Sequence, residues 1–454
     1  MAVPFLTAQT AISRRIGAAK KSVGSWQALL LATAFLFEGF IAKSFIFVGN
    51  DPTTIHYAAS AVLATLMLIF YCMEAKAYRG RFTFLFLAFI ALFWSVIGSY
   101  VSHYALNYLS SVTFSLMIFS CFFWTPFVCM RAGVETWRLV LNVFAVPSVL
   151  SLPMLIVVPS LAIDPDNGRL AGAFISVAVA CNIFSYVATL AAFAIKFAKT
   201  DRERFLYLAV CLISLLLLYL TRTRSSLIEA LLGIFIVAST TVDGRPIFSR
   251  IVKAGAIGGA LMVGTILITL VGGADYQSEV AEFRMEQGIT GSRNENWTFG
   301  VERIIKQPWF GEGMLTKQTQ GGQSTVNMQQ TSTNYNPIYD PHSLLLSLGV
   351  QGGLPFLFAV MLLILLPLFN YTRQVGMGRV LGAPEFVFCF VQLLSMIPAG
   401  GDLTSFGNVT DRIFWILLGS LSLKVALNDA PRKRQARRAY SRFMATAPGQ
   451  WQDR

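Results

Sequence analysis

The sequence predicts an all-α polytopic membrane protein with about twelve transmembrane helices and one large, partly helical loop on the non-cytoplasmic side. Three observations support this fold class. Hydrophobic residues make up 55% of the 454 residues and charged residues only 13%, against about 25% in a typical soluble domain. Apolar runs of about 20 residues, each long enough to cross a bilayer, recur from Trp26 to Lys424. Lysine and arginine collect in short segments between alternate runs.

Other classes fit less well. A transmembrane β-barrel would alternate apolar and polar residues over segments of about ten residues, whereas these runs are continuous. The formal net charge of +13 suggests nucleic acid, but basic residues in short loops are typical of sequences that set membrane orientation. We therefore expect a lipid bilayer, and no nucleic acid, as a partner. The six cysteines lie in apolar runs without metal or disulfide spacing: Cys72, Cys121, Cys129, Cys181, Cys211 and Cys389.

The apolar runs define the organisation of the chain. We expect spans at about 26–48, 56–75, 82–101, 112–130, 138–162, 171–196, 204–220, 226–242, 251–273, 343–370, 380–399 and 406–426. Residues 1–25 form an N-terminal segment, 26–273 carry spans one to nine, and 274–341 form a long polar loop. Residues 342–426 carry the last three spans, and 427–454 form a basic tail.

The positions of the basic residues orient these spans. Segments expected in the cytoplasm contain Arg14, Arg15, Lys20, Lys21, Lys76, Arg79, Arg81, Arg131, Arg138, Lys196, Lys199, Arg202, Arg204, Arg245, Arg250, Lys253, Arg373 and Arg379, and six basic residues between 432 and 442. Loops expected on the other side, such as 102–111 and 400–405, have almost none. Both termini are therefore expected in the cytoplasm.

Two loops break this pattern. One is the short loop Thr221–Ser226, which contains Arg222 and Arg224, and the other is the long loop 274–341. The long loop contains Arg284, Arg293, Arg303, Lys306 and Lys317. Because basic residues on the outer side oppose the preferred orientation, we expect them to serve another purpose.

Local patterns predict structure inside the long loop. Apolar residues at positions 297, 301, 304 and 305 predict an amphipathic helix over 296–306. Pro308 ends this helix, and Gly311 and Gly313 allow a tight turn. The sequence Asp340-Pro-His342-Ser is typical of a helix start.

These residues suit chemistry on a phosphorylated substrate. An arginine fork matches phosphate oxygens, so Arg222 and Arg224 could bind a diphosphate at the lipid–water boundary, with Arg293 on its other side. His342 could take a proton from a sugar hydroxyl as a general base. No metal site is expected, because the three histidines lie on separate loops without an acidic cluster.

Each assignment has a structural alternative. Arg224 could extend to lipid headgroups, Arg293 could form an ion pair within its loop, and His342 could be an interfacial residue without chemistry. We expect structural roles for His56 and His103.

Several ionisable residues lie within or near spans. Such groups are usually functional or paired, and the sequence assigns no partners to Glu38, Lys43, Glu229 and Glu385. Asp411 and Arg412 are adjacent, which suggests local pairs at the start of the last span.

The order of the motifs resembles that of the bacterial O-antigen ligase superfamily, which includes O-antigen and exopolysaccharide polymerases. The motifs are Thr-Arg224-Ser-Ser-Leu at a span start, Gly-Ser-Arg293, Pro308-Trp-Phe-Gly-Glu-Gly, and His342-Ser before an apolar run with glycines. The resemblance is detailed over about 220–360, and the twelve-span layout with one periplasmic loop agrees over the whole chain.

The resemblance implies metal-independent glycosyl transfer in the bacterial inner membrane, with no cofactor and with the active site facing the periplasm. An undecaprenyl-diphosphate-linked glycan is the implied donor, and an acceptor sugar hydroxyl attacks its anomeric carbon with inversion. By position, Arg224 and Arg293 would bind the diphosphate and His342 would activate the acceptor. Arg222 is a neighbouring candidate outside the motif.

The chain departs from the family pattern at three points: Ile228 replaces a leucine, Ser292 separates the glycine from Arg293, and Gly349 lies only seven positions after His342. The interval from the histidine to the glycine is shorter than in the family by close to one helical turn, which would keep both residues on the same helix face.

The acceptor is either another lipid-linked repeat, as in an exopolysaccharide or O-antigen polymerase, or lipid A core, as in a ligase. We slightly favour the polymerase. A flippase for lipid-linked sugars would share the spans but would not need the long loop, and a structural scaffold would not need the outward arginines.

Overall fold

A computed structural model describes residues 23–41, 53–71, 80–101, 105–164, 168–239, 293–314, 343–376, 383–399, 403–405 and 408–446. The helices of the first half are α2 Val23–Ile41, α3 Thr53–Tyr71, α4 Phe82–Val101, α5 Ala105–Met117, α6 Thr125–Ala132, α7 Thr136–Val157, α8 Pro159–Ala162, α9 Val177–Phe197, α10 Asp201–Leu220 and α11 Arg224–Ser239. The later helices are α14 Arg293–Lys306, α16 Leu344–Gly376, α17 Ala383–Ala399 and α18 Val409–Thr446. No strand is assigned in these ranges, and one isolated bridge pairs Ile163 with Leu170.

The all-α polytopic membrane fold is confirmed. Among the described residues, six helical segments are long and apolar enough to cross a membrane: 82–101, 108–132, 136–157, 177–197, 201–220 and 344–374. Helices also occupy five further expected spans, whereas the expected span at 251–273 lies outside the described residues. The count of twelve and the full extent of the long loop therefore stay predictions.

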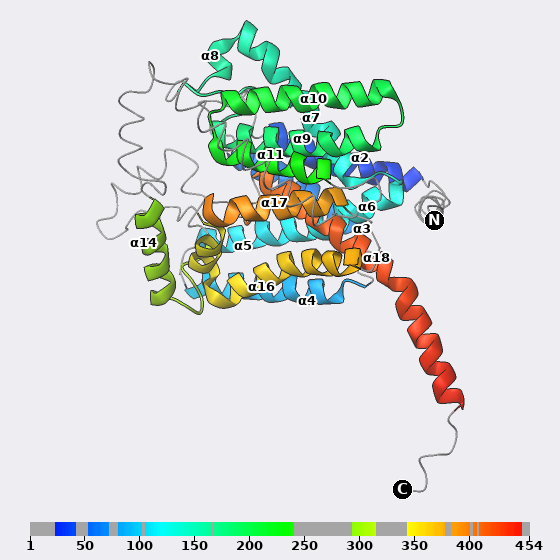
Figure 1. Ribbon diagram of the computed structural model, residues 1–454. Coiled ribbons are helices and arrows are strands. Elements are labelled where there is room, and N and C mark those ends of the chain that lie inside the picture. The colour runs from blue at the N-terminus through cyan, green and yellow to red at the C-terminus, as the bar shows by residue number, and fades with distance from the viewer. Residues whose placement is uncertain are drawn as a thin grey trace.

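The helices form a bundle in which α9 is largely buried. Figure 1 shows α14 at one end of this bundle, while the C-terminal part of α18 leaves the opposite end. Most residues of α9 are buried, and this helix packs against α7, α10, α11 and α17. Its six alanine residues allow this, because small side chains let membrane helices approach closely.

Helix α18 is longer than the sequence predicts. Its 38 residues continue past position 426, where we expected the last span to end. At 1.5 Å per residue such a helix is about 57 Å long, which exceeds the thickness of a bilayer. The start of the expected basic tail therefore continues the helix of the last span (Figure 1).

Helices α5 and α6 join through a π-helical segment, Ile118–Trp124, which leaves backbone carbonyls available to other partners. Arg81 donates to the carbonyl oxygens of Phe122 at 2.6 Å and Gly419 at 3.2 Å, and its guanidinium lies 4.7 Å from the centre of the Phe123 ring. Arg81 lies outside a helix, immediately before α4, as expected of a loop residue, but its side chain is fully buried. It joins α4, the π segment and α18.

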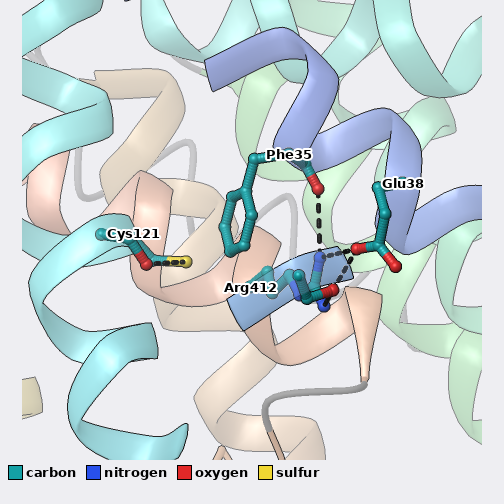
Figure 2. Close-up of polar contacts among 6 residues, drawn as sticks. Phe35, Glu38, Cys121 and Arg412 are labelled. Atoms are coloured by element: carbon teal, nitrogen blue, oxygen red, sulfur yellow. Dashed lines mark hydrogen bonds and ion pairs between the residues drawn. The ribbon is translucent and has the colours of Figure 1, made fainter. Parts of the chain in front are cut away.

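A buried ion pair joins the first and last spans. Arg412 on α18 donates to Glu38 Oε2 at 2.9 Å, to the carbonyl oxygen of Phe35 at 3.0 Å, and to Ser60 Oγ on α3 at 2.6 Å. Figure 2 shows Arg412 approaching Glu38 and the Phe35 ring from the neighbouring helix. The sequence suggested local pairs for Asp411 and Arg412, and it gave no sign of the ion pair between Arg412 and the distant Glu38. Asp411 itself accepts from Asn408 and Ser405.

A second ionic cluster involves Glu385, for which the sequence assigned no partner. Lys424 on α18 donates to Glu385 and to Glu135, each at 2.6 Å. Burial opposes the charge on Glu135, but Lys424 and Arg138 outweigh it and hold the pKa of this carboxyl below its usual value. In each cluster, the helix ends that meet are therefore ends that the predicted topology places on the same side of the membrane. Lys43 lies outside the described residues.

Candidate functional site

The turn between α10 and α11 carries two of the candidate arginines. Helix α10 ends at Leu220, the N–H of Thr221 still donates to the carbonyl oxygen of Leu217, and Arg222 then adopts a left-handed conformation with φ of 53°. Helix α11 begins at Arg224. The predicted turn is confirmed but is shorter than predicted, because Arg224 already belongs to α11; Arg222 and Arg224 are both exposed.

Arg169 contacts the same turn and was missed by the sequence analysis. Its Nε donates to the carbonyl oxygen of Thr221 at 2.7 Å, and its Nη2 donates to Thr223 Oγ1 at 2.5 Å. A signal was available, because Arg169 lies in the loop between the fifth and sixth expected spans, on the side where basic residues are scarce.

Glu229 lies on α11, five residues after Arg224, and its partners are now defined. Ser185 on α9 donates to Glu229 Oε1 at 2.6 Å, and the Gln392 amide on α17 donates to the same oxygen. The carboxyl group is buried, so these bonds satisfy a polar group that would otherwise be destabilising in the bundle. The contacts fix α11, and therefore the turn at its start, against α9 and α17.

The amphipathic helix predicted over 296–306 is confirmed as α14, although it begins three residues earlier, at Arg293. It packs against α16, where Ile304 lies against Gly349. Arg303 is buried and donates to Glu312 Oε1 at 2.7 Å. Arg303, one of the anomalous outward basic residues, therefore has a structural role within its own loop.

The loop Gln307–Gly313 fits a break in α16. Gly353 has non-helical angles, with φ of 73° and ψ of −176°, and Pro355 has no N–H to donate to the carbonyl oxygen of Gln351. The loop supplies the missing partners. Gly313 N–H donates to that Gln351 oxygen at 3.0 Å, and Leu354 N–H donates to the Pro308 oxygen at 2.7 Å.

Glycine and aromatic residues make this close fit possible. A Cβ at Gly353 would lie 2.6 Å from the Trp309 backbone, and a Cβ at Gly98 of α4 would lie 2.5 Å from the Phe310 oxygen. Trp94 of α4 donates its indole N–H to the Trp309 oxygen at 2.5 Å and stacks on Phe310. The loop is thus anchored to both α4 and α16.

The remaining candidates stay predictions. Arg293 is the first residue of α14, but its side chain lies outside the described residues, as does that of His56 on α3. His342 and His103 also lie outside them, although α16 begins two residues after His342. Within the part of the chain that the structure describes, no group of three or more histidine, cysteine or acidic residues could hold a metal ion. The five described cysteines are buried and free, as expected.

Comparison with known proteins identifies the region that contains this site. No curated protein matches the chain. A family model described as O-antigen ligase matches residues 209–361, from within α10 to the part of α16 beyond its break. The match includes the turn with Arg222 and Arg224, helix α14 and the loop anchored in α16. Over residues 209–361 the chain is therefore similar to the O-antigen ligase family, which supports the resemblance indicated by its motifs.

Proposed function

We propose that this multi-pass bacterial membrane protein is an inner-membrane glycosyltransferase that moves a glycan from undecaprenyl diphosphate to an acceptor sugar hydroxyl on the periplasmic side. The family match over 209–361 is the observation that carries this proposal. The matched region includes a turn at which two exposed arginines stand two residues apart at a helix start. Anionic diphosphate is favoured there by both the guanidinium groups and the helix N-terminus.

The proposed reaction needs one base and a set of cations. His342 takes the proton of the acceptor hydroxyl, whose oxygen then forms a bond to the anomeric carbon of the donor sugar. The bond from that carbon to the diphosphate oxygen breaks, and the electron pair leaves with undecaprenyl diphosphate. Arg224, Arg293 and Arg222 stabilise the charge that develops on the diphosphate, so the transfer proceeds without a metal ion.

Variants of these residues test the enzymatic assignment. Arg224→Ala, Arg293→Ala and His342→Ala should each lower glycan transfer by about 10²-fold or more, the range seen for removed charge-stabilising donors and general bases. Arg202→Ala is the matched control, because Arg202 is an exposed arginine in the first turn of α10, whereas Arg222 follows the last turn of the same helix. Unchanged transfer in all three test variants would exclude this mechanism.

The acceptor decides between a polymerase, which we favour, and the O-antigen ligase that the family description names. Glycan analysis of a deletion strain separates them. Single repeat units on the lipid carrier indicate a polymerase, whereas long chains retained on the carrier indicate a ligase.

A further inference from the structure

Arg169 stands on a segment that is fixed to the bundle independently of the α10–α11 turn. The N–H groups of Ala171 and Gly172 donate to the Ala162 oxygen at 2.8 and 2.9 Å, and Ala173 N–H donates to Ser151 Oγ at 2.9 Å. Gly172 has φ of 62°, and a Cβ there would lie 2.5 Å from that same hydroxyl oxygen. The segment therefore provides a firm base for the arginine side chain.

The guanidinium group of Arg169 bonds to the turn on both sides of Arg222. One bond, to the Thr221 carbonyl, satisfies an oxygen at the C-terminal end of α10, where the helix offers no further N–H. The other bond holds the hydroxyl of Thr223, the residue immediately before α11. A weaker backbone bond from Leu170 to Leu220, at 3.5 Å, lies beside them.

The turn has a reason to need this support. A non-glycine residue with positive φ is strained by about 1–2 kcal/mol, so Arg222 would relax to other conformations if the flanking residues were released. Such relaxation would change the spacing and direction of the Arg222 and Arg224 side chains. Two bonds from one planar group, one to each flanking residue, oppose it.

The geometry assigns Arg169 as a positioning residue that holds Arg222 and Arg224 in the arrangement in which they bind the donor diphosphate. This inference rests on the proposed function of those two residues. Lysine cannot replace Arg169, because a single ammonium group does not reproduce the planar fork that reaches two acceptors in fixed directions.

Two residues allow the inference to be tested without changing the net charge. Arg169→Lys keeps the charge and loses the fork, whereas Thr223→Val keeps the side-chain shape and loses the hydroxyl acceptor. Thr223→Ser, which keeps the hydroxyl, is the matched control. The protein in lipid nanodiscs is titrated with undecaprenyl diphosphate, and the Kd is measured together with the thermal unfolding midpoint.

We expect Arg169→Lys and Thr223→Val each to raise the Kd about tenfold, within the range of charge-assisted hydrogen bonds, while Thr223→Ser stays near the original protein. The double variant should bind as Arg169→Lys alone does, because Arg169→Lys already removes the bond to Thr223 Oγ1 that Thr223→Val removes. A Kd unchanged in Arg169→Lys and in Thr223→Val, or effects that add in the double variant, would overturn the inference. If Arg169→Lys does not fold, the difference in Kd between Thr223→Val and Thr223→Ser decides the question alone.

Arg224→Ala separates this inference from the proposed function. If Arg224→Ala leaves the Kd for undecaprenyl diphosphate unchanged, the diphosphate site itself is wrong. If Arg224→Ala weakens binding and Arg169→Lys does not, only the positioning role of Arg169 is wrong.

Discussion

Arginines in two regions of this protein have opposite environments. Inside the bundle, Arg412 and Arg81 are buried, and each donates to two or more helices. At the turn between α10 and α11, Arg222 and Arg224 are exposed at a helix start. Burial of a charge requires full pairing, so the buried arginines serve the fold. The exposed pair lies at the surface, where a diphosphate can reach it.

The largest expected effect comes from breaking the buried pair. Arg412→Leu removes the guanidinium group that forms an ion pair with Glu38 between α2 and α18, which should lower the free energy of unfolding by about 3–5 kcal/mol. Thermal unfolding and the yield of monodisperse protein in detergent measure this loss. The double variant Glu38→Gln/Arg412→Gln should recover part of it. A double variant no more stable than Arg412→Leu would show that the ion pair does not explain the burial of these side chains.

A smaller effect is expected where the long loop is anchored. Gly353→Ala places a Cβ against the Trp309 backbone in a conformation that is almost restricted to glycine, which should destabilise the protein by about 2–3 kcal/mol. It should also lower glycan transfer, because the loop no longer fits the break in α16. Thermal unfolding and a transfer assay on the same preparation measure the two losses.

Gly133→Ala is the control for that variant. Gly133 has nearly the same φ, 71°, but nothing lies within 4 Å of an added Cβ. The Gly133→Ala variant should therefore lose only about 1 kcal/mol of stability and should keep its glycan-transfer activity. Equal losses of stability and transfer in the two variants would contradict the anchoring role of Gly353.

The smallest effect on stability is expected at the exposed turn. Arg222→Gly removes the strain of a positive φ and should change the free energy of unfolding by less than about 1 kcal/mol, in the stabilising direction. Binding of undecaprenyl diphosphate should nevertheless weaken. Strong destabilisation of this variant would place Arg222 with the structural arginines instead of the binding ones.

Much of the fold could be predicted because hydropathy and helix periodicity are local properties. The six described segments that are long and apolar enough to cross a membrane, the turn at Arg222, and the helix before Pro308 all follow from runs of neighbouring residues. The sequence order of the motifs also predicted the family that residues 209–361 match.

The partners of the charged side chains could not be predicted in this way. Arg412 and Glu38 are 374 positions apart, and Arg81 and Ser422 are 341 positions apart. Which helices meet depends on the packing of the whole bundle, so the sequence neighbours of Arg412 gave no indication of its ion pair with Glu38. The fork from Arg169 to Thr221 and Thr223 has the same origin, since it spans 52 and 54 positions.

The sequence by itself determined that this chain enters the membrane repeatedly and presents two arginines at a helix start, because both features are encoded in contiguous residues. Only the tertiary structure decided which arginines are buried within the bundle and which remain at the surface. Pairing and burial depend on contacts between helices that are distant in sequence. The arginine residue itself is chemically identical in either environment, so its identity alone does not reveal which one it occupies.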